Sequence, residues 1–263
     1  KTKRFGVYFL HICYILSLKF LLKFCPTNLG FKTIRHITKS QEVNNAIDNN
    51  LPVLALESTI ITHGMPYPDN LKFAVKAEDT CRKLGVAPAT IALLDGCIYA
   101  GLTFEQLSFI CRNKNNRKIS RRDLGLAITN RWSGGTTVSA TMQVSYNVGI
   151  RVFSTGGIGG IHRGLEKSFD ISQDLVSLKE LPLVVVSSGA KAILDIEKTV
   201  ENLETSGVIV LGYGTNCFSA FYSRETDFKI QRVNSVEKIV KTFKNHLSLG
   251  LSSSELVSNP IPK

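Results

Sequence analysis

The sequence lacks paired or clustered cysteines. No Cys-x-x-Cys motif occurs, and the six cysteines stand at scattered spacings: Cys13, Cys25, Cys81, Cys97, Cys111 and Cys217. Zinc sites and disulfide frameworks use closely or regularly spaced cysteines, so neither is indicated, and we expect reduced, mostly buried thiols. Internal repeats and low-complexity segments are also missing. With 263 residues, 43% of them hydrophobic, the chain can form one sizeable core.

Acidic residues are missing from the first 40 positions, which hold eight Lys or Arg residues. Most of the formal net charge of +11 lies there, because the remaining 24 basic and 21 acidic residues leave only +3. A nucleic-acid surface needs clustered Lys and Arg, so we expect no nucleic-acid partner. One later segment comes close, with Arg112, Lys114, Arg117, Lys118, Arg121 and Arg122. We assign it to a small phosphorylated ligand.

A long uninterrupted apolar run is missing as well. Residues 5–24 follow a basic start and carry an apolar stretch of signal-type length, but Lys19 and Lys23 interrupt it. A membrane span needs about 20 mainly apolar residues. We therefore expect residues 1–38 to be a targeting leader, with a short signal anchor as the alternative, and residues 39–263 to be the folded domain. The leader indicates an organelle or secretory route; without it the cytoplasm is expected.

Apolar runs of strand length alternate with helical patterns after the leader. Strands are predicted over residues 52–56, 89–94, 150–154, 183–187 and 208–211, and helices over residues 69–84, from 103, over 192–205 and over 235–249. Thr103 and Gln106 form a capping-box pair. Continuous apolar strands covered by amphipathic helices are typical of a sheet buried on both faces. The predicted fold is a three-layer α/β/α arrangement with a central, largely parallel or mixed sheet.

Ligands of such sheets bind beyond the carboxyl ends of the strands. The residues at these ends are Glu57-Ser-Thr, Asp95-Gly, Thr155-Gly-Gly and Ser188-Gly-Ala-Lys191. We therefore expect a carboxylate, a glycine loop and a lysine to converge on one crevice.

The richest of these segments runs from Val152 to Arg163. It contains Gly156, Gly157, Gly159 and Gly160, followed by His162, Arg163 and then Asp170 and Asp174. Glycines allow close approach of backbone amides to a ligand and positive φ. A structural bend explains the glycines equally well, but the imidazole, guanidinium and carboxylates favour a site.

Lys191 and Glu57 have alternative explanations of their own. A lysine partly buried where a strand passes into a helix can lose its proton and become a nucleophile for carbonyl carbons, although most lysines are solvated. A carboxyl after an apolar strand suits proton donation, and a helix cap or paired core carboxylate is the alternative. His63 is expected to hydrogen-bond a turn rather than to serve the crevice.

Asp170 and Asp174 are four residues apart and would share a face if helical. Oxygen ligands would suit magnesium or manganese. A carboxylate pair at a helix N-terminus is the alternative.

Several motifs together resemble the pseudouridine-5'-phosphate glycosidase family. They are Ala55-Leu-Glu-Ser-Thr-Ile-Ile-Thr-His-Gly-Met-Pro66, Ser120-Arg-Arg-Asp123, Gly135-Thr-Thr-Val138, Thr155-Gly-Gly-Ile-Gly-Gly-Ile-His-Arg163, Phe169-Asp-Ile-Ser172 and Ser188-Gly-Ala-Lys-Ala-Ile-Leu-Asp195. The resemblance extends in order from about Ile47 to Pro262.

The resemblance implies reversible cleavage of the carbon-carbon glycosidic bond of pseudouridine 5'-phosphate to uracil and ribose 5-phosphate. It implies that Lys191 is the covalent nucleophile, through an imine, and that Glu57 is the proton donor. Asp170 would hold a divalent cation, usually manganese, mainly through waters. The implied substrate contacts are Lys118, the backbone near Val138, His162, Ser172, Gln173 and Asp174. A homotrimer is also implied.

The chain departs from the family pattern in three ways. Family domains continue beyond the Asn-Pro-Ile-Pro motif, whereas this sequence stops at Lys263; Ser219 stands where proline is usual; and the leader is foreign to bacterial members. Two alternatives therefore stand beside the glycosidase. One is a truncated, inactive relative that acts as a binding or assembly module, and the other is an enzyme acting on a different ribosyl phosphate.

Overall fold

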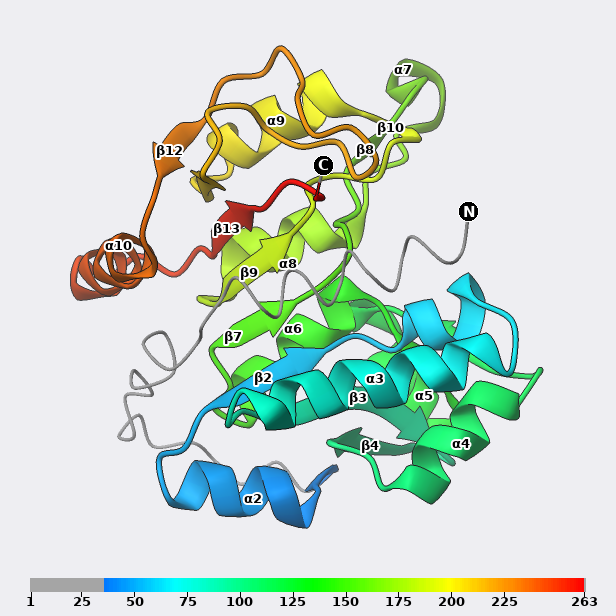
Figure 1. Ribbon diagram of the computed structural model, residues 1–263. Coiled ribbons are helices and arrows are strands. Elements are labelled where there is room, and N and C mark those ends of the chain that lie inside the picture. The colour runs from blue at the N-terminus through cyan, green and yellow to red at the C-terminus, as the bar shows by residue number, and fades with distance from the viewer. Residues whose placement is uncertain (1–35, 263) are drawn as a thin grey trace. The chain divides into compact units, whose positions relative to one another are not determined.

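The computed structural model describes residues 36–262, which form two compact units (Figure 1). Unit 1 comprises the described residues up to Phe153, and unit 2 those from Ser154 onward. The division falls inside strand β7 (Val152–Ser154).

Unit 1 is built on a mixed sheet. Its strands are β1 (Ile37–Lys39), β2 (Val53–Leu56), β3 (Ala87–Leu94), β4 (Cys97–Ala100), β5 (Arg117–Ile119) and β6 (Gly134–Thr136). The pairs β1-β4, β2-β3 and β5-β6 are parallel, whereas β3 pairs antiparallel with β4 and with β6. Every residue of β2 is buried, which explains its uninterrupted apolar sequence.

Helices cover the strands of unit 1. They are α2 (Gln41–Asp48), the π-helix η2 (Ile60–Gly64), α3 (Asp69–Lys83), α4 (Phe104–Arg112), the 3-10 helix η3 (Arg121–Asp123), α5 (Leu124–Thr129) and α6 (Val138–Asn147). Helix α3 packs against β3, and α6 against β2 and β6 (Figure 1). The capping box predicted at Thr103 and Gln106 opens α4, so this prediction is confirmed.

Unit 2 contains a fully parallel sheet of four strands in the order β9-β13-β11-β12. These strands are β9 (Val184–Ser187), β11 (Ile209–Tyr213), β12 (Gln231–Val233) and β13 (Glu255–Ser258). Two short antiparallel strands, β8 (Ile161–His162) and β10 (Leu194–Asp195), pair separately. The helices are α7 (Leu165–Ser168), α8 (Gln173–Glu180), α9 (Ile196–Thr205) and α10 (Val236–Ser248).

The predicted α/β class, with a parallel or mixed sheet and flanking helices, is confirmed. The start of α9 was predicted wrongly, because the helix begins at Ile196 rather than near Ala192. The Asp195 side chain accepts a hydrogen bond from the Lys198 amide, and this N-cap fixes the start.

The described residues include the end of the predicted leader and four of the six cysteines. Strand β1 begins at Ile37, so the sheet starts two residues inside the predicted leader, most of which lies outside the described residues. No helix in the described part of the chain is long and apolar enough to cross a membrane. Cys81, Cys111 and Cys217 are buried free thiols, as expected, whereas Cys97 is exposed.

Candidate active site

The predicted site residues divide between the two units. Unit 1 holds Glu57, Lys118 and Val138, and unit 2 holds His162, Asp170, Ser172, Gln173, Asp174 and Lys191. Their convergence on one crevice stays a prediction.

Glu57 lies directly after β2 on a loop that buried hydroxyl groups fix in place. The Glu57 side chain is half-buried. Next to it, the Ser58 hydroxyl donates to the Ile91 carbonyl at 2.5 Å and accepts from the Thr136 amide at 2.8 Å. The Thr59 hydroxyl donates to the Thr136 carbonyl at 2.8 Å. The loop that carries Glu57 is thus attached to both β3 and β6.

Lys118 and Val138 lie near each other in unit 1. Lys118 is exposed on β5, opposite Gly135 of β6. The Thr137 amide donates to the Ile119 carbonyl at 2.9 Å, so α6 begins beside the end of β5. Val138 is only 1% exposed as a whole residue, so its side chain and its backbone are both buried. Amides of a first helical turn favour anions, and Lys118 adds a positive charge nearby.

Several side chains of the basic segment 112–122 have partners within the fold, and its assignment to a small phosphorylated ligand stays a prediction. The Arg112 guanidinium stacks over the Tyr67 ring at 5.3 Å, and the Arg117 guanidinium over the Trp132 ring at 5.0 Å. The Arg121 Nε atom donates to the Gln143 side chain at 2.7 Å, and Arg122 pairs with Asp123 at 3.5 Å. Four of the six side chains are therefore engaged within the fold.

The glycine loop of unit 2 is shaped by close packing. The Gly159 amide donates to the Asp174 carboxylate at 2.8 Å, and a Cβ on Gly159 would lie 2.1 Å from the Ser172 hydroxyl. A Cβ on Gly160 would lie 2.5 Å from the Thr199 hydroxyl. The expectation of positive φ at these glycines was wrong, because none of them is among the described glycines that adopt positive φ. Close approach of neighbouring polar groups is the reason for glycine here.

Lys191 lies on a segment that is hydrogen-bonded to this loop. The Ile158 amide donates to the Gly189 carbonyl at 3.0 Å, and the Lys191 amide donates to the Ile158 carbonyl at 3.1 Å. The Lys191 side chain is half-buried. A turn and β10 separate Lys191 from α9, which corrects the expectation that its strand passes directly into a helix.

His162 lies on β8, which pairs with the strand that follows Lys191. It pairs with Leu194 across β8 and β10, three positions after Lys191. Its amide donates to the Asp170 carbonyl at 3.0 Å, and its Nδ1 atom lies 3.8 Å from the Asp170 carboxylate. The imidazole and the carboxylate are 40% and 60% exposed, so both can meet a ligand.

Asp170 and Asp174 do not share a helical face, contrary to the expectation from their spacing. Asp170 precedes α8, whereas Asp174 lies in its first turn and is only 5% exposed. The described residues contain no group of three or more His, Cys, Asp or Glu side chains that could hold a metal ion. An exposed single carboxylate at Asp170 fits an ion that keeps most of its waters, and it does not fit a protein cage.

Ser172 and Gln173 form the N-terminus of α8. The Ser172 hydroxyl accepts from the Asp174 amide at 3.2 Å, and the Ser172 amide donates to the Gly160 carbonyl at 2.9 Å. Both side chains are half-buried. The helix start is thereby attached to the glycine loop.

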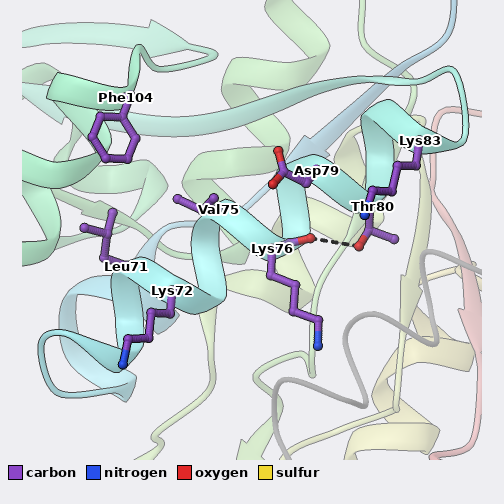
Figure 2. Close-up of a pocket in the computed structure, with 8 residues that line it drawn as sticks. All are labelled: Leu71, Lys72, Val75, Lys76, Asp79, Thr80, Lys83 and Phe104. Carbon is purple, nitrogen blue, oxygen red and sulfur yellow. Dashed lines mark hydrogen bonds between the residues drawn. The ribbon is translucent and has the colours of Figure 1, made fainter.

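Two other features lie apart from the predicted residues. The His63 Nδ1 atom shares a hydrogen bond with the Thr62 hydroxyl at 2.8 Å, and His63 lies in η2 rather than in the expected turn. A surface cavity of about 460 Å³ runs along α3, and Figure 2 shows its wall. Its lining consists of Leu71, Lys72, Val75, Lys76, Asp79, Thr80, Lys83 and Phe104. None of the predicted site residues lines it.

Sequence reasoning missed Thr199. Its side chain is fully buried on α9, and its hydroxyl accepts from the Ile161 amide at 3.0 Å. Ile161 lies 38 positions before Thr199, so no local sequence pattern predicts this contact.

Comparison with known proteins gives consistent matches. The family model described as "Indigoidine synthase A like protein" matches residues 42–263. The pseudouridine-5'-phosphate glycosidase of Dinoroseobacter shibae is 51% identical over 222 residues, which are 84% of this chain and 73% of that protein. The protein of the same name from Caldanaerobacter subterraneus is 48% identical over 230 residues, 87% of this chain and 75% of that protein.

Two solved structures are also similar. An indigoidine synthase A-like protein from Thermotoga maritima has a TM-score of 0.77 at 35% identity and covers 81% of this chain and 71% of its own. The prealnumycin C-glycosynthase AlnA, solved with ribulose 5-phosphate, has a TM-score of 0.82 at 36% identity, covering 88% of this chain and 75% of its own.

Proposed function

The chain belongs to the indigoidine synthase A-like family, and from this membership we propose that it is an enzyme that reversibly cleaves pseudouridine 5'-phosphate to uracil and ribose 5-phosphate. The observation that carries the proposal is about 50% identity, over most of the folded chain, to proteins named pseudouridine-5'-phosphate glycosidase. The AlnA complex adds that a similar structure binds a pentose phosphate.

Lys191 is the nucleophile in this proposal. Its Nζ atom bonds to C1 of the ribose and releases a proton, while the C1–O4 bond breaks and O4 takes a proton. The bond between C1 and the uracil ring then breaks, the ring carbon takes a proton, and C1 remains as an imine on the lysine. Water hydrolyses the imine and releases ribose 5-phosphate and the free amine. The hydrogen bond of the Lys191 amide to the glycine loop supports a fixed position for its backbone.

His162 and Glu57 handle the two protons. His162 is the group that protonates or orients the uracil, which its exposure and its place on β8 beside the Lys191 segment support. Glu57 is the proton donor for O4, a role that rests on the family motif; its fixed loop in unit 1 supports a defined position. The two residues lie in different units, and each role is tested by its own substitution.

We assign the phosphate to Lys118 and to the amides at the start of α6 near Val138. Ser172 and Gln173 at the start of α8 contact the substrate directly. The buried Asp174 carboxylate accepts a hydrogen bond from the Gly159 amide, so Asp174 contributes by holding the glycine loop in place.

A divalent cation, manganese in first place, would be held by Asp170 mainly through waters, where it would add positive charge near the substrate. The proposed assembly is a homotrimer, which sedimentation of the purified protein tests. The alternative of another ribosyl phosphate is not favoured, because the curated relatives are named pseudouridine-5'-phosphate glycosidase.

The testing experiment incubates the protein with pseudouridine 5'-phosphate and manganese and follows uracil release by chromatography. Lys191→Ala is expected to abolish release. Lys179→Ala, which removes an exposed lysine of α8, is the matched control and should release uracil like the wild type. Wild-type protein that is folded and releases no uracil would overturn the proposal. Release that persists in Lys191→Ala would overturn the role of the lysine.

A further inference from the structure

The short strand β8 lies in the middle of a three-segment ladder. On one side Ile161 and His162 pair with Asp195 and Leu194 of β10. On the other side Ile161 forms a bridge with Ile171, and the His162 amide donates to the Asp170 carbonyl at 3.0 Å. A two-residue strand has few hydrogen bonds of its own, so the position of His162 depends on this ladder.

Thr199 connects the ladder to α9. Its hydroxyl donates to the Asp195 carbonyl at 2.6 Å and accepts from the Ile161 amide at 3.0 Å. The same oxygen therefore joins the end of β10 to the start of β8. The Thr199 side chain is fully buried, so water does not compete for either hydrogen bond.

The packing around Thr199 is close on the side of the glycine loop. A Cβ on Gly160 would lie 2.5 Å from the Thr199 hydroxyl oxygen and 2.7 Å from its methyl carbon. Gly160 directly precedes the strand that carries His162. The threonine thus limits how the loop can move relative to α9.

We propose that Thr199 is a positioning residue that fixes His162 relative to Lys191 by joining β8, β10 and α9. The Leu194 amide donates a hydrogen bond to the Lys191 carbonyl at 3.0 Å, and this bond connects Lys191 to the first residue of β10. Thr199 therefore acts on the end of the segment that carries the nucleophile and on the start of the strand that carries the imidazole. The consequence for catalysis rests on the function proposed above, whereas the consequence for β8 does not.

The catalytic test uses three variants. Thr199→Val keeps the volume and removes the hydroxyl, Thr199→Ala removes it with less volume, and Thr199→Ser keeps it. We expect the Val and Ala variants to lower kcat for uracil release by about ten-fold or more, because small misplacements of reacting groups are costly. KM should change less than about two-fold, and Thr199→Ser should recover most of the activity. Either hydroxyl-free variant decides the question if the other does not fold.

A double-variant cycle identifies the group through which Thr199 acts. In a His162→Ala background, Thr199→Val should cause a clearly smaller loss of kcat than in the wild type, because the positioned imidazole is already absent and only the effect on the Lys191 segment remains. A full additional ten-fold loss in that background would overturn the proposal. Wild-type kcat in a folded Thr199→Val variant would overturn it as well.

A second readout does not depend on activity. Hydrogen exchange at the amides of Ile161 and His162 should be about ten-fold faster in Thr199→Val and unchanged in Thr199→Ser, while β9 exchanges as in the wild type. Unchanged exchange at β8 would overturn the proposal even in an active enzyme. If the wild type releases no uracil, the proposed function fails, and the exchange experiment still decides the role of Thr199.

Discussion

Glu255 gives the protein a pH-dependent stability that can be measured directly. This carboxyl lies on β13, is fully buried, and neither of its oxygens has a hydrogen-bond partner among the described residues. Burial raises its pKa from 4.5 to about 8, and no neighbouring charge contributes to the shift. The folded state therefore holds this proton more tightly than the unfolded state does.

The sign of the effect follows from this difference in proton binding. The stabilising contribution is fully present below the unfolded pKa of 4.5 and is lost as pH rises through the folded pKa of about 8. Each pH unit between these values costs about 1.4 kcal/mol, so the free energy of unfolding falls by up to about 4 kcal/mol between about pH 5 and pH 9.

Glu255→Gln removes the ionisable group at similar volume. We expect the variant to lose most of this pH dependence and to be more stable than the wild type by up to several kcal/mol above about pH 8. Urea unfolding followed by circular dichroism at several pH values measures it. Glu201→Gln, at an exposed position of α9, is the control and should unfold like the wild type. Parallel stability curves for the wild type and Glu255→Gln across this pH range would refute the reasoning.

Two further predictions concern unit 1. Arg82→Met removes the guanidinium that donates to the buried Glu78 carboxylate at 3.0 Å and should lower the free energy of unfolding by about 1–3 kcal/mol, because Glu78 loses a partner. Urea unfolding checks this against Lys83→Met, an exposed neighbour, and equal midpoints for the two variants would contradict it. Lys118→Ala should raise KM for ribose 5-phosphate about ten-fold in uracil-dependent synthesis and leave kcat nearly unchanged, as expected for a phosphate contact. Lys114→Ala is its control, and an unchanged KM in Lys118→Ala would exclude the assigned phosphate site.

The sequence predicted best where local chemistry decides the structure. The apolar run before Glu57 became the fully buried β2, and Thr103 with Gln106 became the cap of α4. The positions of Glu57 and Lys191 at strand ends also indicate a site without any family resemblance, and their role in it stays a prediction.

Contacts between segments that are distant in the sequence could not be predicted. Strand β6 consists of Gly134, Gly135 and Thr136 and has no apolar pattern; its glycines are needed because a Cβ on Gly134 would lie 2.1 Å from the Arg117 carbonyl oxygen. The four-residue spacing of Asp170 and Asp174 indicated a shared helical face, but α8 begins only at Gln173. Such features follow from pairing and packing that a single sequence does not encode locally.

The proposed imine between Lys191 and the sugar can be trapped by reduction. Treatment of the protein with ribose 5-phosphate and borohydride, followed by peptide mass spectrometry, locates the reduced product. We expect a stable ribitol 5-phosphate adduct on Lys191 in the wild type and in Lys179→Ala, and no adduct in Lys191→Ala. A folded protein without an adduct, or an adduct at another lysine that persists in Lys191→Ala, would contradict this expectation.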